Sequence, residues 1–360
     1  MTNVVHVITK LDYGGAQSIA RSLLLEQRAR GHKVAIISGL LGPIADDLRA
    51  CGILVIQEPR LVHHVSLTHD RDAVAGVAAT LRRLGADVVH AHSSKGGVVG
   101  REASRRLGVP AVYTAHGWPF QPGAAVRQRV VSFAGEWIAS KRHGDVVCVA
   151  ASELELARKL RIASPDRLHL VHNGVGHRSE PAPTAAPVRE GLRIVMVARF
   201  APPKRHDLLI DAVRAIPSAT AVLVGAGRDL AAAQSRAADL GERVRFVGYT
   251  DPSPYINDAD VVVLLADYEG LPVTVLEAMR AKRAIVVNQL PGLADVVVDG
   301  ISAEICSLTV TSLVGALRRL SDPILRADLA DVAHGVWRSR FTIGDMADGY
   351  ERVYAKVLRI

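Results

Sequence analysis

Cysteine and aromatic residues are scarce in this sequence of 360 residues, which holds 3 cysteines and only 4% Phe, Trp and Tyr. Cys51, Cys148 and Cys306 lie far apart and form no C-x-x-C pair. A disulfide scaffold and a zinc ribbon are therefore excluded, and this cysteine usage is typical of a reducing cytoplasm. The few aromatics, and the lack of a helix-turn-helix, RNP or zinc pattern, also argue against nucleic-acid binding.

Long apolar runs are missing as well. The longest, Val261 to Ala266, has six residues, whereas about 18 are needed to span a bilayer. The first residues read directly as a strand, without a basic segment or a cleavage site, so we expect no signal peptide. The proportions of 49% hydrophobic and 22% charged residues are those of an ordinary globular protein, which we expect to be cytoplasmic.

Positive charge is concentrated in the first half of the chain. Residues 1–180 hold 23 Lys and Arg against 15 Asp and Glu, whereas residues 181–360 hold 21 of each. The formal net charge of +8 therefore lies entirely in the first half, together with 12 of the 14 histidines. This asymmetry indicates an anionic partner, which could be a phosphate group, a lipid surface or, least in keeping with the composition, a nucleic acid.

Short Val- and Ile-rich runs alternate with helical stretches along the whole chain. They predict thirteen strands, from Val4–Thr9 to Ala303–Cys306, and the strands are apolar on both faces, as parallel strands covered by helices on each side are. This alternation predicts doubly wound α/β sheets. One stretch, 177–190, is rich in proline and alanine without apolar periodicity, and predicts a linker.

The sequence thus predicts two Rossmann-like domains, at 1–176 and 191–340, joined by the linker 177–190. A closing helix at 341–360 has helical apolar spacing, which leaves open whether it caps the second domain or crosses back to the first.

Three unusual clusters follow strands of the first domain, where ligands of parallel sheets bind. The paired glycines Gly14-Gly15 open a helix, so they allow either close approach of an anion or a tight turn. His90 and His92 lie on one face of a strand and could bind a metal, but no carboxylate or cysteine nearby completes a ligand set. The alternatives are a polar substrate loop with Ser93 and Lys95, or structural histidines.

The third cluster is His116-Gly117-Trp118 with Phe120. A histidine at a strand end, followed by glycine, can project into a cleft, and the aromatic side chains could form an apolar wall for a sugar ring. The alternative is a structural histidine.

Two more clusters follow strands of the second domain. Arg199 ends a strand and Lys204 stands at the head of the next helix, so the two cations could clamp a diphosphate without a metal or simply be solvated. Glu269 and Glu277 flank Gly270-Leu271-Pro272, with Pro272 suited to the first helical position. Two carboxylates at this spacing can face one ligand and accept hydrogen bonds from pairs of sugar hydroxyls.

These motifs, in this order across two Rossmann halves, resemble the retaining GT-B glycosyltransferases of the family-4 group. The resemblance covers nearly the whole chain, and 90–120 further resembles bacterial enzymes that build capsule, exopolysaccharide or O-antigen. It implies a GT-B fold and retaining, metal-independent transfer of a sugar from a UDP- or GDP-linked donor, with no cofactor beyond this co-substrate. Phe200, Arg205 and Gln17 depart from the family pattern, in which leucine, glycine and glutamate are more usual.

The resemblance also implies a role for each matching residue. Arg199 and Lys204 would hold the donor diphosphate, Glu277 the ribose, and Glu269 the donor sugar, while His116 would contact the transferred sugar near the reacting carbon. The rest of the implied donor site is formed by Gly14, Gly15, Tyr249, Gly270 and Leu271, and the implied acceptor side by His92, Ser93, Lys95 and Trp118. The first domain would bind a glycan or a polyprenyl-diphosphate-linked acceptor.

Other functions stay open. A nucleotide-sugar epimerase or a non-catalytic sugar-nucleotide-binding module could share this architecture. A NAD-dependent oxidoreductase is disfavoured because Leu230 stands where the third glycine after Gly225-Ala226-Gly227 should be. The pair Asp258 and Asp260 spells the acid motif of metal-dependent glycosyltransferases, but it precedes its strand instead of following it.

The stretch 124–143 reads as a basic amphipathic helix. Its apolar residues are at helical spacing, and basic residues flank them: Val126, Val130, Phe133, Trp137 and Ile138, with Arg127, Arg129, Lys141 and Arg142. Such a helix could lie on an anionic membrane, which would make the protein peripheral on the inner face of the cell membrane. The alternative is that the apolar residues pack into the core of the first domain.

Overall fold

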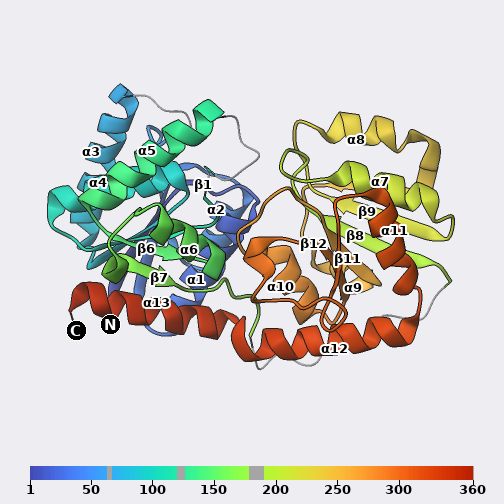
Figure 1. Cartoon of the computed structure of the whole chain (residues 1–360). Helices are drawn as coiled ribbons and strands as arrows, with labels where there is room; N and C mark the ends of the chain where they lie inside the picture. Colours follow the sequence, from blue (N-terminus) through green and yellow to red (C-terminus); the bar gives the residue numbers. More distant parts are fainter. Residues whose placement is uncertain (63–66, 119, 121–125, 178–189, 360) are drawn as a thin grey trace. The chain divides into compact units, whose positions relative to one another are not determined.

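The structure is a computed structural model, and it describes residues 1–62, 67–118, 120, 126–177 and 190–359. It consists of two compact units (Figure 1), Met1–Gly174 with Ile343–Ile360, and Val175–Thr342. Each unit is a parallel sheet covered by helices, which confirms the predicted fold class. The predicted linker, 177–190, lies almost wholly outside the described residues.

The sheet of the first unit has seven parallel strands in the order β3-β2-β1-β4-β5-β6-β7. The strands are β1 (Asn3–Lys10), β2 (Lys33–Leu40), β3 (Leu54–Gln57), β4 (Val88–His92), β5 (Ala111–Ala115), β6 (Asp145–Cys148) and β7 (Leu168–Leu170). The strand order reverses between β1 and β4, and ligands of open α/β sheets bind beside such a reversal, at the carboxyl ends of the strands.

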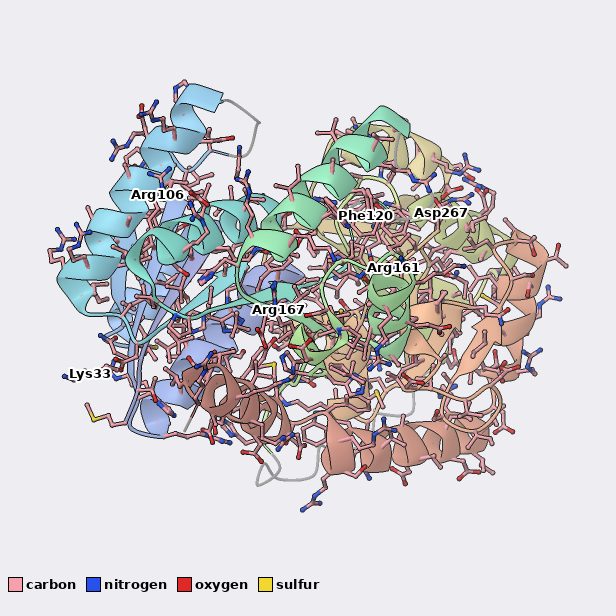
Figure 2. All side chains as sticks on the ribbon, turned by 60° about the vertical axis from the view of Figure 1, so that its left-hand side comes forward. Lys33, Arg106, Phe120, Arg161, Arg167 and Asp267 are labelled. Carbon is pink, nitrogen blue, oxygen red and sulfur yellow. The ribbon has the colours of Figure 1, made fainter. Side chains whose placement is uncertain are left out.

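Helices cover both faces of this sheet. On one face α3 (Leu67–Leu84), α4 (Ser94–Leu107) and α5 (Val126–Arg142) pack side by side, and on the other α1 (Gly15–Ala29) packs against α2 (Pro43–Ala50) (Figure 1). The helix α6 (Ala151–Lys159) packs on β6 and β7, and the short 3-10 helix η1 spans Pro165–Arg167. Charged side chains such as those of Lys33 and Arg106 are exposed on this unit (Figure 2).

The last helix, α13 (Ile343–Leu358), belongs to the first unit, so the sequence question of which domain it caps is answered. It packs against α1, where the Arg30 guanidinium donates to the carboxylates of Asp348 at 2.6 Å and Glu351 at 3.0 Å. Gly349 of α13 lies close to Val171, the residue after β7. An added Cβ on Gly349 would be 2.7 Å from a Val171 methyl. The close approach buries the inner face of α13 in the first unit.

The helix α5 exposes part of the predicted apolar stripe. Val130, Trp137 and Ile138 are 61%, 40% and 45% exposed, whereas Phe133 packs against the buried cluster beside β5 and β6. The hypothesis that the stripe packs into the core is therefore wrong for most of its described length. The side chain of Val126 lies outside the described residues.

The second unit repeats the same topology with six parallel strands in the order β10-β9-β8-β11-β12-β13. The strands are β8 (Leu192–Val197), β9 (Ala219–Val224), β10 (Val244–Gly248), β11 (Val261–Leu264), β12 (Ala284–Asn288) and β13 (Glu304–Cys306). The α-helices are α7 (His206–Ala215), α8 (Leu230–Arg236), α9 (Ser253–Asp258), α10 (Val273–Arg280), α11 (Val310–Arg319) and α12 (Pro323–Arg340), and the 3-10 helices are η2 (Ala238–Arg243) and η3 (Pro291–Leu293). Here the reversal lies between β8 and β11.

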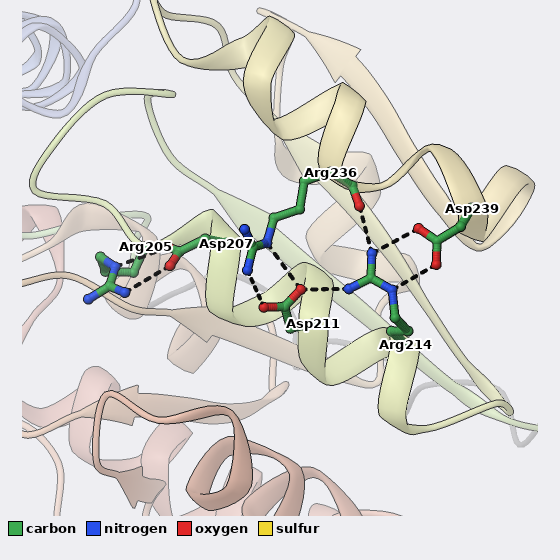
Figure 3. A network of polar contacts seen from close by, with 6 residues as sticks. All are labelled: Arg205, Asp207, Asp211, Arg214, Arg236 and Asp239. Carbon is green, nitrogen blue, oxygen red and sulfur yellow. Dashed lines mark hydrogen bonds and ion pairs between the residues drawn. The ribbon is translucent and has the colours of Figure 1, made fainter.

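A network of charged side chains ties the outer surface of α7 to α8 (Figure 3). The Asp211 carboxylate accepts from Arg214 at 2.6 Å and from Arg236, and Arg214 also donates to Asp239 at 2.7 Å. These groups are exposed, so water screens each pair and its contribution to stability is small. The network fixes how α8 lies on α7.

Candidate active site

The predicted donor residues of the second unit meet where its strand order reverses. Arg199 follows β8 and Glu269 follows β11, and these two strands are hydrogen-bonded neighbours. Backbone hydrogen bonds join the two loops, because the Arg205 N–H donates to the Leu265 carbonyl at 3.0 Å and the Asp267 N–H donates to the Pro203 carbonyl at 2.9 Å. The loops therefore form one surface at the carboxyl ends of β8 and β11.

Lys204 and Glu269 form an ion pair on this surface. Their side chains are only 14% and 22% exposed, so the pair is partly shielded from solvent. A lysine ammonium has three donors, and one carboxylate oxygen does not use them all. Two residues that the sequence placed in one site are thus in contact, and donors of Lys204 remain for a further anion.

Arg199 is exposed, and among the described residues its guanidinium forms no ion pair. Its loop is held by the glycines after β9: an added Cβ on Gly225 would be 2.1 Å from the Ala198 carbonyl oxygen, and one on Gly227 2.3 Å from that of Phe200. Both glycines also have positive φ, 142° and 157°. The motif Gly225-Ala226-Gly227, which was considered as part of a dinucleotide site, instead packs against the backbone on either side of Arg199.

His206, the first residue of α7, is a site residue that the sequence analysis missed. Its ring stacks on Phe200 with centroids 4.0 Å apart, and a hydrogen bond joins it to the backbone of Ala198. Burial, aided by the Lys204 charge, lowers the pKa of His206 to about 4, so the ring is neutral at pH 7. Phe200 and His206 therefore support the Arg199 loop from inside.

Glu277 lies on α10, half-buried, and no described residue hydrogen-bonds its carboxylate. Burial raises its pKa to about 7; Arg280 opposes this rise and Asp251 adds to it. A half-buried carboxylate without a donor in the protein is stabilised when a ligand donates hydrogen bonds to it. Hydroxyl groups of a ligand would supply that donor.

The loop from Glu269 to Leu271 is fixed by two residues that the sequence analysis did not single out. The Asn288 amide at the end of β12 accepts from the Ala266 N–H and donates to the Ala266 carbonyl, both at 2.9 Å. An added Cβ on Gly292 would lie only 1.6 Å from the Gly270 carbonyl oxygen, so the loop passes directly over this glycine. Gly270 and Leu271 are themselves buried.

Two further residues of the predicted donor site have clear positions. Pro272 is the N-cap of α10, one residue earlier than the sequence suggested, because the helix begins at Val273. Tyr249 is 43% exposed and follows Gly248, whose carbonyl accepts from the Gly225 N–H at 2.8 Å. The Tyr249 backbone therefore lies beside the glycine loop that supports Arg199.

The glycine pair of the first unit opens α1, with Gly14 as the N-cap. Gly14 has an extended backbone, with φ 166°, that any residue adopts. An added Cβ there would meet only the flexible end of Gln17, at 2.5 Å. Apart from that movable side chain, the fold does not require glycine at this position, which weakens the tight-turn alternative. Gly14 and Gly15 are both exposed at the N-terminus of the helix and leave open space there.

His116 follows β5 and is half-buried. Its Nε2 lies 3.1 Å from the Nδ1 of His92, which is fully buried. Burial lowers the pKa of His116 to about 4, so this ring is neutral at pH 7.

The structure corrects the predicted acceptor side. Trp118 is fully buried, its indole N–H donating to the Glu153 carbonyl at 3.0 Å, and Phe120 is stacked on it inside the core. His92 is buried as well, so neither it nor Trp118 can touch an acceptor. Both side chains therefore have a structural role. The prediction was wrong because the sequence pattern does not reveal what packs over these strands.

The two other predicted acceptor-side residues are engaged within the unit. The Lys95 ammonium is bound by the Asp70 carboxylate. The Ser93 hydroxyl is hydrogen-bonded to that of Thr9 at 2.7 Å. Both side chains are half-buried, and each is bound by a residue of the first unit.

Three histidines, His6, His90 and His92, lie at metal-ligating spacing, with one ligand atom of each within 4.8 Å of the others. The sequence analysis considered only the last two, since His6 is far away in the chain. All three are buried, and each of their six ring nitrogens is already within hydrogen-bond distance of a protein atom. A metal would have to displace these bonds; the expectation of a metal-free protein stays a prediction.

Two family models match the chain, one on each unit. Residues 14–174 match the glycosyl transferase 4-like domain, and residues 191–322 match the glycosyl transferases group 1. The chain is a glycosyltransferase of this group. No helix among the described residues has the length and apolar character needed to cross a membrane.

Related proteins agree with this assignment. The Escherichia coli UDP-Gal:alpha-D-GlcNAc-diphosphoundecaprenol alpha-1,3-galactosyltransferase is 28% identical over 305 residues, which are 78% of this chain and 78% of that protein. Among solved structures, Anabaena HepE in complex with UDP and glucose has a TM-score of 0.84 at 19% identity, with 99% of this chain and 100% of that chain covered. Sucrose-phosphate synthase from Thermosynechococcus elongatus has a TM-score of 0.86 at 19% identity, with 99% of both chains covered. The fold of this glycosyltransferase is thus GT-B, as the resemblance implied.

Proposed function

We propose that this glycosyltransferase moves a sugar from a UDP- or GDP-linked donor to a glycan or a polyprenyl-diphosphate-linked acceptor, with retention of the anomeric configuration and without a divalent metal. The observation that carries the proposal is the group at the strand reversal of the second unit. There the unpaired Arg199 cation, the Lys204–Glu269 pair and the unpartnered Glu277 carboxylate come from one surface and its adjoining helix.

In this proposal Arg199 and Lys204 bind the donor diphosphate. Cleavage of the bond between the sugar and the phosphate leaves negative charge on the departing nucleotide, and fixed cations stabilise that charge as it develops. The half-buried setting of Lys204 strengthens this effect, because the ammonium is partly shielded from water. Two such cations can replace a divalent metal at the diphosphate.

The remaining contacts bind and orient the donor. Glu277 would accept from the ribose hydroxyls, which fits a carboxylate that lacks a donor in the free protein. Glu269, Gly270 and Leu271 would orient the sugar, and the Tyr249 backbone would contact the base. On the first unit, Gly14 and Gly15 would approach the phosphates and His116 would contact the transferred sugar.

Retention does not require a nucleophilic side chain if the reaction takes place on one face of the sugar. In a front-face reaction the acceptor oxygen forms the new bond to the anomeric carbon on the face from which the nucleotide leaves. The proton of the acceptor hydroxyl passes to the departing phosphate oxygen, and the nucleoside diphosphate is released. The E. coli relative, whose name gives an α-1,3 product, fits the same stereochemistry, since the galactose of UDP-galactose is α-linked.

A lipid-linked acceptor and a role in bacterial surface polysaccharide biosynthesis are the finer part of the proposal. The E. coli relative is named for an acceptor on diphosphoundecaprenol, a lipid of the membrane. On α5 the exposed Val130, Trp137 and Ile138 are followed by the exposed cations Lys141 and Arg142. Such a surface suits reversible attachment to an anionic leaflet, so we propose a cytoplasmic enzyme that is peripheral on the membrane.

The test is turnover of labelled nucleotide sugars with lipid-diphosphate acceptors, followed by proton NMR of the early product. We expect transfer that continues in EDTA and a product with the anomeric configuration of the donor. An inverted product would refute retention, and activity that EDTA abolishes and magnesium or manganese restores would refute metal independence. Binding of donor without any turnover would instead indicate a non-catalytic module.

A further inference from the structure

A row of hydrogen bonds runs through the first unit from Gln27 on α1 to His116. The Nε2 of His116 lies 3.1 Å from the Nδ1 of His92, and the Nε2 of His92 lies 2.9 Å from the Nδ1 of His6. The Nε2 of His6 lies 2.9 Å from the Oε1 of Gln27. Three rings, on β1, on β4 and directly after β5, are therefore linked end to end. His6 and His92 are linked through both of their nitrogens, and His116 through one.

All the rings in this row are neutral at pH 7. Burial lowers the pKa of His6 and of His116 to about 4, and it lowers the pKa of His92 well below the ordinary value. A neutral imidazole has one N–H donor and one bare acceptor nitrogen. The row therefore has a direction: once the proton of one ring is assigned, every other proton follows.

The Gln27 amide assigns the direction. Its Nε2 donates to the Tyr354 hydroxyl of α13 at 2.9 Å, so its Oε1 faces His6 and can only accept. His6 must then carry its proton on Nε2 and accept on Nδ1, and the same follows for His92 in turn.

The last ring in the row, His116, donates from Nε2 and is left with a bare Nδ1. No described residue hydrogen-bonds that nitrogen.

We propose that Gln27, His6 and His92 are positioning residues that hold His116 in the Nε2–H tautomer, so that its bare Nδ1 accepts a hydrogen bond from a sugar hydroxyl. This inference rests on the proposed function, which puts His116 at the transferred sugar. It also specifies the substrate, because a bare nitrogen binds a hydroxyl but repels a carboxylate. We therefore expect discrimination against a uronic acid whose carboxylate would occupy this place.

The same hydrogen bonds argue against a metal at His6, His90 and His92. A ring nitrogen that carries a proton cannot ligate a metal, and the nitrogens of His6 and His92 that face each other already share one. The nitrogens of His90 are engaged by the hydroxyls of Tyr354 at 2.6 Å and Thr114 at 2.8 Å. In this cluster the position of the proton on one ring sets its position on the next. Zinc binding is the competing explanation, and the experiment must exclude it.

The test is 15N NMR of the full chain with labelled histidine at pH 7, in which protonated and bare ring nitrogens have distinct shifts. His116→Gln identifies the signals of His116 by their loss. We expect the wild type to show a protonated Nε2 and a bare Nδ1 at His116, unchanged by zinc or by EDTA. A protonated Nδ1 would overturn the proposal, as would loss of the shared proton between His6 and His92 when zinc is added.

Two near-isosteric variants then test the origin of the tautomer. Gln27→Met removes both the donor and the acceptor at the head of the row, and we expect mixed tautomers at His116. Tyr113→Phe is the matched control, because Tyr113 is buried on β5 and its hydroxyl hydrogen-bonds Ser94, which is not part of the row. This control should leave the His116 tautomer unchanged.

Activity completes the test. We expect Gln27→Met to lower kcat by about tenfold, as loss of a group that orients a functional histidine does, while Tyr113→Phe stays near the wild type. Mixed tautomers with an unchanged kcat would overturn the positioning role. The tautomer of His116 is measured without substrate, so a failure of the transfer assay alone counts against the proposed function and not against this row.

Discussion

At Lys204 a single ammonium is shared between the protein and the proposed ligand. Its ion pair with Glu269 fixes the ammonium at the edge of the second sheet before any donor arrives. We expect Lys204→Ala to lower kcat by ~100-fold or more, as loss of one fixed donor to a developing oxyanion does. The measurement is steady-state turnover of a labelled nucleotide sugar.

The neighbouring cation provides the control for this variant. Arg205 is engaged by Asp207 at 2.8 Å (Figure 3). It also pairs with Asp267 at 3.6 Å, so its charge is used within the protein. Arg205→Ala should therefore keep kcat close to the wild type. If both variants were equally active, Lys204 would not belong to the site.

The carboxyl group of Glu277 makes nucleotide binding depend on pH. Its pKa is about 7 in the free protein, and a ligand hydroxyl donates only to the ionised form with full strength. We expect the affinity for the nucleoside diphosphate to rise by up to about tenfold between about pH 6 and pH 8, which equals a pKa change of one unit on binding. Calorimetric titration at both pH values measures this.

Glu277→Gln should bind the nucleotide more weakly and lose this pH dependence. The same variant should be more stable than the wild type at alkaline pH, because a raised carboxyl pKa means that stability is fully present below the ordinary value, 4.5, and is lost as pH rises through about 7. Thermal unfolding at acid and alkaline pH checks the sign. Unchanged affinity would contradict the ribose role.

The sequence allowed the donor residues to be predicted because they follow strands. The carboxyl ends of parallel strands converge at one edge, so Arg199, Lys204 and Glu269 could be grouped without knowing any distance. The burial of Trp118 could not be foreseen because it depends on α6, which comes later in the chain, and that of His92 because its neighbours His6 and His116 lie far from it in sequence. His206 and Asn288 are single polar residues without a pattern and gave no signal.

The strands could be predicted from the sequence more easily than the short helices. All thirteen predicted strands are present, because a run of Val and Ile between turn residues is a strong local signal. Short helices such as α2 and α9 give a weaker signal, since eight and six residues are too few for a clear period. The start of α12 follows ordinary sequence rules, since Asp322 caps it and Pro323 begins it.

Two helices of the first unit are joined by a buried ion pair. The Arg101 guanidinium of α4 donates to the Glu136 carboxylate of α5 at 2.8 Å, with both side chains 1% exposed, and also to the Ser140 hydroxyl at 2.7 Å. Glu136→Leu leaves the arginine charge buried without its partner. We expect it to lower the free energy of unfolding by about 3–5 kcal/mol, measured by urea denaturation.

The double variant Arg101→Met with Glu136→Leu supplies the comparison. It replaces both charges by apolar groups of similar size, so it should recover much of the lost stability. A double variant that is no more stable than Glu136→Leu would show that packing, and not the unpaired charge, causes the loss.

For the whole molecule, the charge asymmetry predicts which part meets a membrane. All of the net positive charge lies in residues 1–180, and α5 exposes apolar side chains beside Lys141 and Arg142. We expect weak co-sedimentation with anionic vesicles at low salt, and none with neutral vesicles or at high salt, since each basic residue near the leaflet contributes about 1 kcal/mol.

Two charge-reversed variants separate this surface from general positive charge. Lys141→Glu with Arg142→Glu should abolish the co-sedimentation. The matched control is Arg82→Glu with Arg83→Glu, an adjacent exposed pair at the end of α3, which changes the net charge equally. Equal sedimentation of the two variants would mean that the overall positive charge, and not the exposed surface of α5, causes the binding.

The return of α13 to the first unit has a consequence for synthesis on the ribosome. Tyr350 and Tyr354 complete the hydrogen bonds around His90 and Gln27, but they are translated after every strand of both sheets. The second unit is continuous in sequence, so its strands can pair as soon as they leave the exit tunnel. The first unit cannot complete its fold until the last helix emerges, because His90 and Gln27 lack their hydrogen-bond partner Tyr354 before then. Nascent chains that end at Thr342, followed by a linker long enough to fill the exit tunnel, should therefore hold a protease-resistant second unit and a first unit that is still readily cut.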